Sequence, residues 1–159
     1  MPQHPSRVQC TPAFPSILLV ALGSGVGWAL ARAGWPLARF VVADTSMAPA
    51  LLPGDRLLVL RWGRARDGAV VVTRDPEDRV GYLVKRVEAR VLENGGGPAT
   101  YRLVGDNRVL SRDSRAFGLV PATLIIGTVL WRYLPGNRRG FLRPPNGYDA
   151  DHTAHRSGH

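Results

Sequence analysis

The chain contains one lysine among twenty arginines, and this lysine, Lys85, could do chemistry that an arginine cannot. A lysine buried in apolar surroundings can be neutral near pH 7 and accept a proton, whereas an arginine stays charged. Lys85 lies in the segment Tyr-Leu-Val-Lys-Arg-Val, between apolar residues. A single lysine must also fall somewhere, so its surroundings decide whether Lys85 is a candidate general base.

Histidine and cysteine are scarce where a catalytic site would need them. The four histidines, His4, His152, His155 and His159, all lie in the polar ends, and Cys10 is the only cysteine. A Ser-His-Asp triad, a Cys-His pair or a histidine-rich zinc site therefore has no histidine available in the body of the chain. We expect no metal and no cofactor, and a base other than histidine.

The distribution of charge along the chain limits the classes of partner that we expect. The net charge is +9, but the basic residues are scattered rather than gathered in a stripe. A nucleic-acid-binding protein usually shows such a stripe or a recognisable reading module. We therefore expect no nucleic-acid partner. Attraction to an anionic membrane surface accounts for the positive charge as well as nucleic-acid binding would.

Residues with catalytic potential gather in three segments, residues 44–55, 83–87 and 105–121. Each has an ordinary structural interpretation when it is taken alone. Ser46 could be a turn serine, and Pro-Gly-Asp at 53–55 a plain β-turn. Asp113 with Arg115 could be a surface ion pair, which typically contributes under about 1 kcal/mol.

Together and in this order, the segments resemble signal peptidase I and its small relatives, the serine endopeptidases that use a Ser/Lys dyad. Residues 46–55 meet the family pattern Ser-Met-x-Pro-x-Leu followed by x-x-Gly-Asp, and residues 85–87 meet Lys-Arg-Val. Residues 105–121 meet Gly-Asp-Asn-x-x-x-Ser-x-Asp-Ser-Arg-x-x-Gly-x-Val-Pro without a mismatch. The resemblance spans residues 41–135.

The resemblance implies a role for each matching residue. Ser46 is the expected nucleophile, and its backbone N–H supplies half of the oxyanion hole. Lys85 is the expected general base, and Ser111 orients its amine. The remaining matches are the supporting ion pair of Asp113 with Arg115 and the substrate-binding residues Met47 and Pro49. The expected partners are precursor proteins with N-terminal leader peptides and membrane lipid, and we expect a monomer.

Two departures from the family pattern leave alternatives open. Where the family commonly has Ser or Gly, two positions before the nucleophile, this chain has Asp44. An ionised carboxylate there would repel an oxyanion, so either Asp44 points away or a second donor comes from elsewhere.

The second departure is a compact layout, similar to an actinobacterial subgroup that includes proteases proposed to trim nickel superoxide dismutase precursors. A maturation protease of that kind and a catalytically inactive membrane scaffold are the alternative functions.

The elements that must position these residues follow an uncharged N-terminal stretch. Residues 13–31 carry no charge and are about long enough for one transmembrane helix. A cleaved signal peptide and a buried or interfacial helix are the alternatives. Residues 1–12 are a polar N-terminus, residues 41–135 the peptidase domain, and residues 136–159 a disordered tail. The arginines after residue 31 favour a cytoplasmic catalytic domain, whereas the family pattern places it on the extracytoplasmic side. We expect a single-pass protein of the cell membrane with its catalytic domain on the extracytoplasmic side.

Short apolar and β-branched segments follow the N-terminal stretch, separated by Gly, Pro and Asp. We expect strands at residues 56–60, 69–73, 83–92, 101–104 and 123–131, with a hairpin tip at residues 94–98. The predicted fold is mainly β, a small signal-peptidase-like barrel or sandwich after one transmembrane helix.

Overall fold

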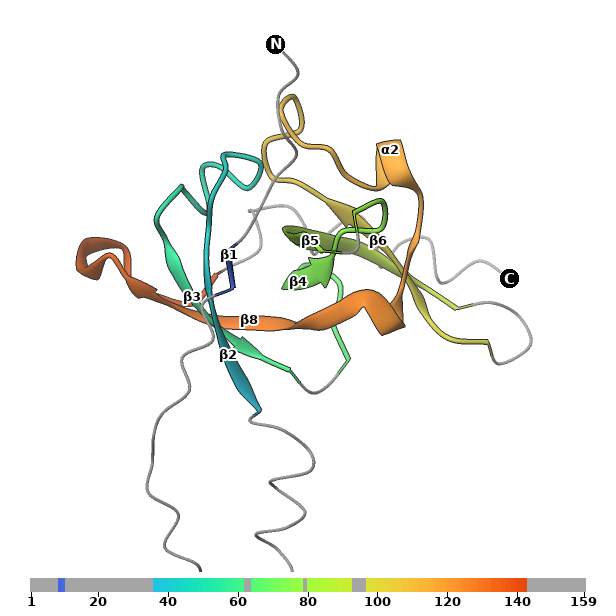
Figure 1. Cartoon of the computed structure of the whole chain (residues 1–159), viewed down its shortest axis with the longest axis horizontal. Helices are drawn as coiled ribbons and strands as arrows, with labels where there is room; N and C mark the ends of the chain where they lie inside the picture. The colour runs from blue at the N-terminus through green and yellow to red at the C-terminus, as the bar shows by residue number, and fades with distance from the viewer. Residues whose placement is uncertain (1–8, 11–35, 62–63, 79, 93–96, 143–159) are drawn as a thin grey trace, which may run out of the picture.

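The computed structural model describes residues 9–10, 36–61, 64–78, 80–92 and 97–142, and its strands form one antiparallel sheet (Figure 1). The strands pair in the order β1-β2-β3-β8-β4-β5-β6-β7. They are β1 (Gln9–Cys10), β2 (Leu37–Val41), β3 (Arg56–Leu60), β4 (Val70–Arg74), β5 (Tyr82–Val91), β6 (Thr100–Val104), β7 (Val120–Pro121) and β8 (Ile125–Leu134). The short helices are α2 (Ser114–Phe117), η1 (Ala122–Leu124) and η2 (Gly136–Arg138).

The predicted mainly β fold is confirmed, and the five expected strands correspond to β3, β4, β5, β6 and β8. The strand β2 was not predicted; it begins at Leu37, before the expected start of the domain at residue 41. The two-residue strands β1 and β7 were also not predicted, because such short pairings leave no alternation of apolar and polar residues.

Two predictions concern the ends of the chain. The predicted transmembrane helix at residues 13–31 lies outside the described residues, and within the described part no helix is long and apolar enough to cross a membrane. The predicted tail begins at residue 136, but η2 forms there, and Gly140 pairs with Arg132 of β8. Residues 143–159 lie outside the described residues.

The long strand β8 joins the two parts of the sheet, because it pairs with β3 on one side and with β4 on the other. Gly127 allows this close approach, since a Cβ there would lie 2.2 Å from the carbonyl oxygen of Leu60. Buried residues form two apolar clusters. One contains Phe40, Val42, Met47, Leu51, Leu57, Val59, Val70, Val72, Val84 and Val129, and the other Ala65, Val71, Val87, Tyr101, Leu103 and Val120.

Candidate active site

Ser46 is carried by the loop between β2 and β3, residues 42–55, which we call the nucleophile loop. Two backbone hydrogen bonds join the two ends of this loop, from Val42 N to Asp55 O at 2.9 Å and from Gly54 N to Val42 O at 2.8 Å. Gly54 adopts a φ of 88°, a conformation that favours glycine. Met47 and Leu51 are fully buried in the larger apolar cluster, so the loop is fixed to the core from within.

Lys85 lies in β5, where its backbone pairs with Val71 of β4, and the pairing of β5 with β6 begins at the next residue, Arg86. Its side chain is fully buried, and Nζ donates a hydrogen bond to Ser111 Oγ at 2.9 Å. Burial lowers the pKa of Lys85 from 10.5 to about 8, although the nearby carboxylates of Asp44 and Asp113 oppose this shift. A buried ammonium is costly, and the neutral amine is a proton acceptor.

A second loop, residues 105–113, brings Ser46 close to the lysine; we call it the orienting loop. Asn107 N donates to Ser46 O at 3.0 Å, which ties the two loops together. A Cβ on Gly105 would lie 2.1 Å from Ser111 Oγ and 2.6 Å from Ser46 O. Only glycine therefore fits where the Ser46 backbone and the Ser111 side chain meet. Both loops lie at the same end of the sheet (Figure 1).

The geometry thus places Ser46, Ser111 and Lys85 in one cluster. Ser46 is almost fully buried, with 4% of its surface exposed. Among the residues that the structure describes, Lys85 Nζ is hydrogen-bonded to Ser111 and not to Ser46. Catalytic hydrogen bonds are often long before substrate binds, so this arrangement is compatible with proton transfer between Ser46 and Lys85.

Asp44 points toward the nucleophile, not away from it. Its Oδ1 accepts a hydrogen bond from Ser46 N at 2.8 Å. The backbone N–H that the family resemblance assigns to the oxyanion hole is therefore occupied by a carboxylate of the same chain. Of the two expectations for this position, an Asp44 that points away is wrong.

The two residues predicted to bind substrate differ in exposure. Met47 is fully buried in the core, whereas Pro49 is exposed on the nucleophile loop. Met47 therefore holds the loop in place, and Pro49 has a free surface.

Asp113 and Arg115 form a bidentate ion pair, with Arg115 Nε and Nη2 each donating to Asp113 at 2.8 Å. Asp113 also accepts from Gly105 N at 3.1 Å, so it ties the start of the orienting loop to its end. Burial alone would raise the pKa of Asp113, but the hydrogen bonds from the Arg115 side chain and from the backbone of Gly105 and Arg115 lower it to about 2.

The low pKa of Asp113 predicts that acid weakens the fold. A carboxyl whose folded pKa lies below its unfolded value of 3.8 stabilises the protein above about pH 4 and loses that contribution as the pH falls towards 2. Asp113→Asn is expected to lower the free energy of unfolding at pH 7 by about 2 kcal/mol, and to flatten its decline below pH 4. Urea denaturation at pH 7, 4 and 3 measures both effects. Asp67→Asn removes an equal charge from an exposed position, and an equal loss in that control would contradict the assignment.

Two further groups of side chains hold the site, and neither was predicted from the sequence. Arg86, fully buried, donates to both carboxylate oxygens of Asp106 at 2.7 Å and to Gly68 O at 2.8 Å. Arg112 forms ion pairs with Asp75 and Glu77, which tie the orienting loop to the turn after β4. Arg86 adjoins Lys85 in sequence, but alternation along a strand sends the two side chains to opposite faces.

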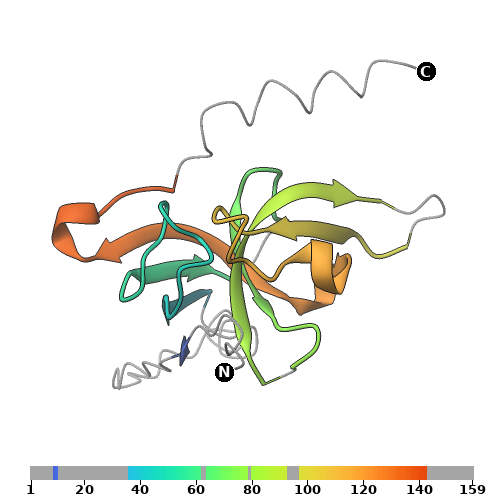
Figure 2. The ribbon, with the colours of Figure 1, turned by 90° about the horizontal axis from the view of Figure 1, so that it is seen from above.

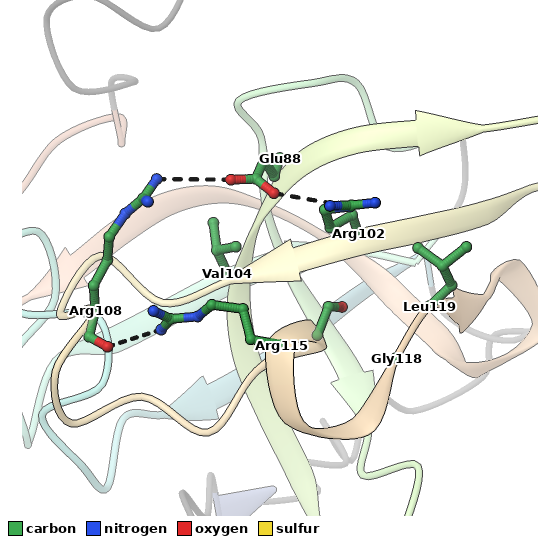
Figure 3. Close-up of a pocket in the computed structure, with 8 residues that line it drawn as sticks. Glu88, Arg102, Val104, Arg108, Arg115, Gly118 and Leu119 are labelled. Atoms are coloured by element: carbon green, nitrogen blue, oxygen red, sulfur yellow. Dashed lines mark hydrogen bonds and ion pairs between the residues drawn. The ribbon is translucent and has the colours of Figure 1, made fainter.

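A pocket of about 220 Å³ lies beside the Arg115 side chain, apart from the Ser46 cluster (Figure 3). Glu88 lies between Arg108 and Arg102, at 3.6 and 3.9 Å, and Arg115 donates to the carbonyl of Arg108 at 2.8 Å. The pocket is lined by Glu88, Arg102, Val104, Arg108, Ser114, Arg115, Gly118 and Leu119. Ser46 and Lys85 do not line it.

Within the described ranges, no group of three His, Cys, Asp or Glu residues is placed to hold a metal ion.

Comparison with known proteins identifies relatives of this chain. Residues 16–90 and 97–134 match the family model of signal peptidase, peptidase S26. Signal peptidase I of Leptolyngbya laminosa is 45% identical, over 70% of this chain and 75% of the relative. The mitochondrial ATP-independent inner membrane protease subunits 1a and 1b of Arabidopsis thaliana are 33% and 32% identical. They align with 66% and 62% of this chain, and 78% and 71% of their own lengths.

Proposed function

The chain belongs to the signal peptidase family, peptidase S26, and from this premise we propose that Ser46 and Lys85 are its catalytic dyad. Family membership makes the chain a signal peptidase, a serine-type endopeptidase. One observation carries the assignment of the dyad. Lys85 is fully buried with its amine held by Ser111, beside the loop that bears Ser46.

In the proposed mechanism, Ser46 Oγ attacks the carbonyl carbon of the scissile peptide bond while Lys85 Nζ takes its proton. Lys85 returns a proton to the leaving amine, and an acyl-enzyme on Ser46 remains. Water, deprotonated by Lys85, then hydrolyses the acyl-enzyme. Ser111 keeps the amine directed at the reacting atoms through its 2.9 Å hydrogen bond.

The lowered pKa of Lys85 supports its role as the base. At the ordinary lysine pKa, roughly one molecule in 2,500 would carry a neutral amine at pH 7, a deficit of about 4.6 kcal/mol. With the pKa of Lys85 at about 8, roughly one molecule in ten does. Burial therefore removes most of this deficit in neutral amine.

The oxyanion hole requires a rearrangement at Asp44. The Ser46 N–H that would stabilise the oxyanion donates to Asp44 in the uncomplexed chain. In the proposed mechanism the substrate carbonyl oxygen replaces the Asp44 carboxylate at that N–H. Each turnover therefore includes the displacement of a charged side chain.

The proposed substrates are precursor proteins whose N-terminal signal or leader peptides are cleaved off. Relatives named as inner membrane proteases support a location at the membrane. The family pattern favours a catalytic domain on the extracytoplasmic side. The relatives do not favour a specialised superoxide dismutase maturation protease or an inactive scaffold.

The rate at which Ser46 is acylated tests the dyad directly. With a small serine-acylating inhibitor and the full-length chain, we expect the second-order rate to rise with pH and to level off above a midpoint of about 8, because only neutral Lys85 accepts the proton. Mass spectrometry locates the adduct. An adduct on another residue, or a rate that does not change between pH 6 and 9, would refute the proposal.

A further inference from the structure

The segment that follows β8, residues 135–142, folds back along that strand; we call it the C-terminal strap. Gly140 exchanges two backbone hydrogen bonds with Arg132, at 3.0 and 3.1 Å. Phe141 packs edge-on against Trp131, with ring centroids 4.6 Å apart. The strap is therefore fixed to the end of β8, on the same side of the molecule as the nucleophile loop (Figure 2).

Arg138 reaches from the strap to the nucleophile loop at three points. Its Nη1 donates to Asp55 Oδ1 at 3.0 Å, and its Nη2 lies 3.3 Å from Pro49 O and 3.4 Å from Ala50 O. Arg132 of β8 donates to Ala50 O at 2.7 Å and lies 3.4 Å from Asp55 Oδ2. Two guanidinium groups thus hold the backbone just after Ser46.

Asp55 is the centre of this cluster. It is 1% exposed and also accepts from Leu52 N at 3.0 Å, so it fixes the far end of the nucleophile loop. Without Arg138, Arg132 would still pair with the buried carboxylate, and no buried charge would be left alone. The loss of Arg138 therefore affects the placement of the loop more than the stability of the fold.

We infer that Arg138 is a positioning residue for catalysis, which sets the place of Ser46 relative to Lys85 by holding the Pro49 and Ala50 carbonyls. The inference rests on the proposed function of Ser46 as the nucleophile. Arg138 contacts neither reacting atom. A displacement of about 1 Å at a reacting group can cost about 100-fold in rate, and the nucleophile loop carries Ser46 within four residues of both carbonyls.

The neighbouring residue offers a matched control, because Arg139 is exposed and belongs to the same strap. Arg138→Ala and Arg139→Ala remove the same charge from adjacent positions of the full-length chain. We expect Arg138→Ala to lower the acylation rate of Ser46, and kcat for a leader-bearing precursor, by about 10- to 100-fold, with KM within about twofold. Arg139→Ala should match the wild type. Arg138→Lys should recover part of the rate, since an ammonium reaches Asp55 but lacks the planar fork that bridges several acceptors.

The outcomes separate this inference from the proposed function. If the wild-type chain is not acylated at Ser46, the proposed function fails. If the wild-type chain is acylated and both alanine variants react at its rate, only the positioning role of Arg138 is overturned. Thermal unfolding is measured alongside. An Arg138→Ala protein that is unfolded at 25 °C would also overturn the inference, because it would make the role of Arg138 structural.

Discussion

Replacement of Lys85 by methionine is expected to abolish cleavage and to make the protein more stable at neutral pH. The first effect follows because Lys85 is the proposed general base, and loss of a catalytic dyad member typically costs about 10⁴-fold or more in kcat. The second follows because the folded protein buries the amine and lowers the pKa of Lys85 from 10.5 to about 8. A shift of this size corresponds to about 3 kcal/mol of destabilisation while the lysine is charged.

The pH range of the stabilisation follows from the sign of the shift. Below about pH 8, Lys85 is protonated in both the folded and the unfolded chain, and the full penalty applies. Between pH 8 and 10.5 the unfolded chain binds more protons, so the wild type gains stability as the pH rises. The advantage of Lys85→Met should therefore be largest at pH 7 and shrink above pH 8. Urea denaturation at pH 7 and 9.5, beside a precursor cleavage assay, measures both effects.

Two companion variants complete this test. Ser46→Ala should abolish cleavage equally but keep the wild-type dependence of stability on pH, because Lys85 is still buried. Lys85→Arg should be inactive and less stable than the wild type, since a guanidinium stays charged in the same buried place. An active Lys85→Arg enzyme would mean that Lys85 serves only as a cation.

Replacement of Asp44 by serine is expected to increase kcat. Asp44 accepts the Ser46 N–H at 2.8 Å, and removing the carboxylate frees that donor for the oxyanion. One oxyanion-hole donor is typically worth about 10²- to 10³-fold in kcat, so a gain of about tenfold is a conservative expectation. Asp44 also raises the pKa of Lys85, and its loss should move the midpoint of the pH–rate profile below 8. Steady-state kinetics from pH 6 to 9 measure both effects.

The isosteric variant Asp44→Asn separates the charge from the hydrogen bond. An asparagine side chain can still accept the Ser46 N–H through its carbonyl oxygen, but it carries no charge. We expect its pH–rate midpoint to move as far as that of Asp44→Ser, with a smaller gain in kcat. If both variants lose activity, the Asp44 carboxylate is required for the reaction, and the proposal that substrate displaces it is wrong.

Regular strands were the part of the fold that the sequence predicted well. The strand at residues 56–60 was predicted with its observed bounds, because four apolar residues follow Arg56 directly after a Pro-Gly-Asp turn. The strand β2 was missed because it begins only six residues after an apolar stretch and contains Arg39. Its identity depends on pairing with β3, which is information that a local pattern does not contain.

The same distinction applies to the site. Ser46, Lys85 and Ser111 were predicted because they match family motifs, which place particular residue types at a fixed spacing. The contact of Arg138 with Asp55 joins residues 83 positions apart and involves a segment that was predicted to be disordered. Asp44 was recognised as unusual, but the direction of its side chain depends on the conformation of the nucleophile loop. Long-range side-chain contacts leave no periodic trace in a sequence.

The place of β8 in the sheet also determines when activity can arise as the chain is made. The nucleophile loop joins β2 to β3, Lys85 lies on β5, and in the sheet β3 and β4 each pair with β8, the last of the described strands in the chain. During translation Ser46 and Lys85, the proposed dyad, leave the ribosome before β8, the strand that pairs with both β3 and β4. We therefore expect the proposed nucleophile and base to come together only after β8 has been synthesised. We expect the order of synthesis itself to delay the onset of proteolysis.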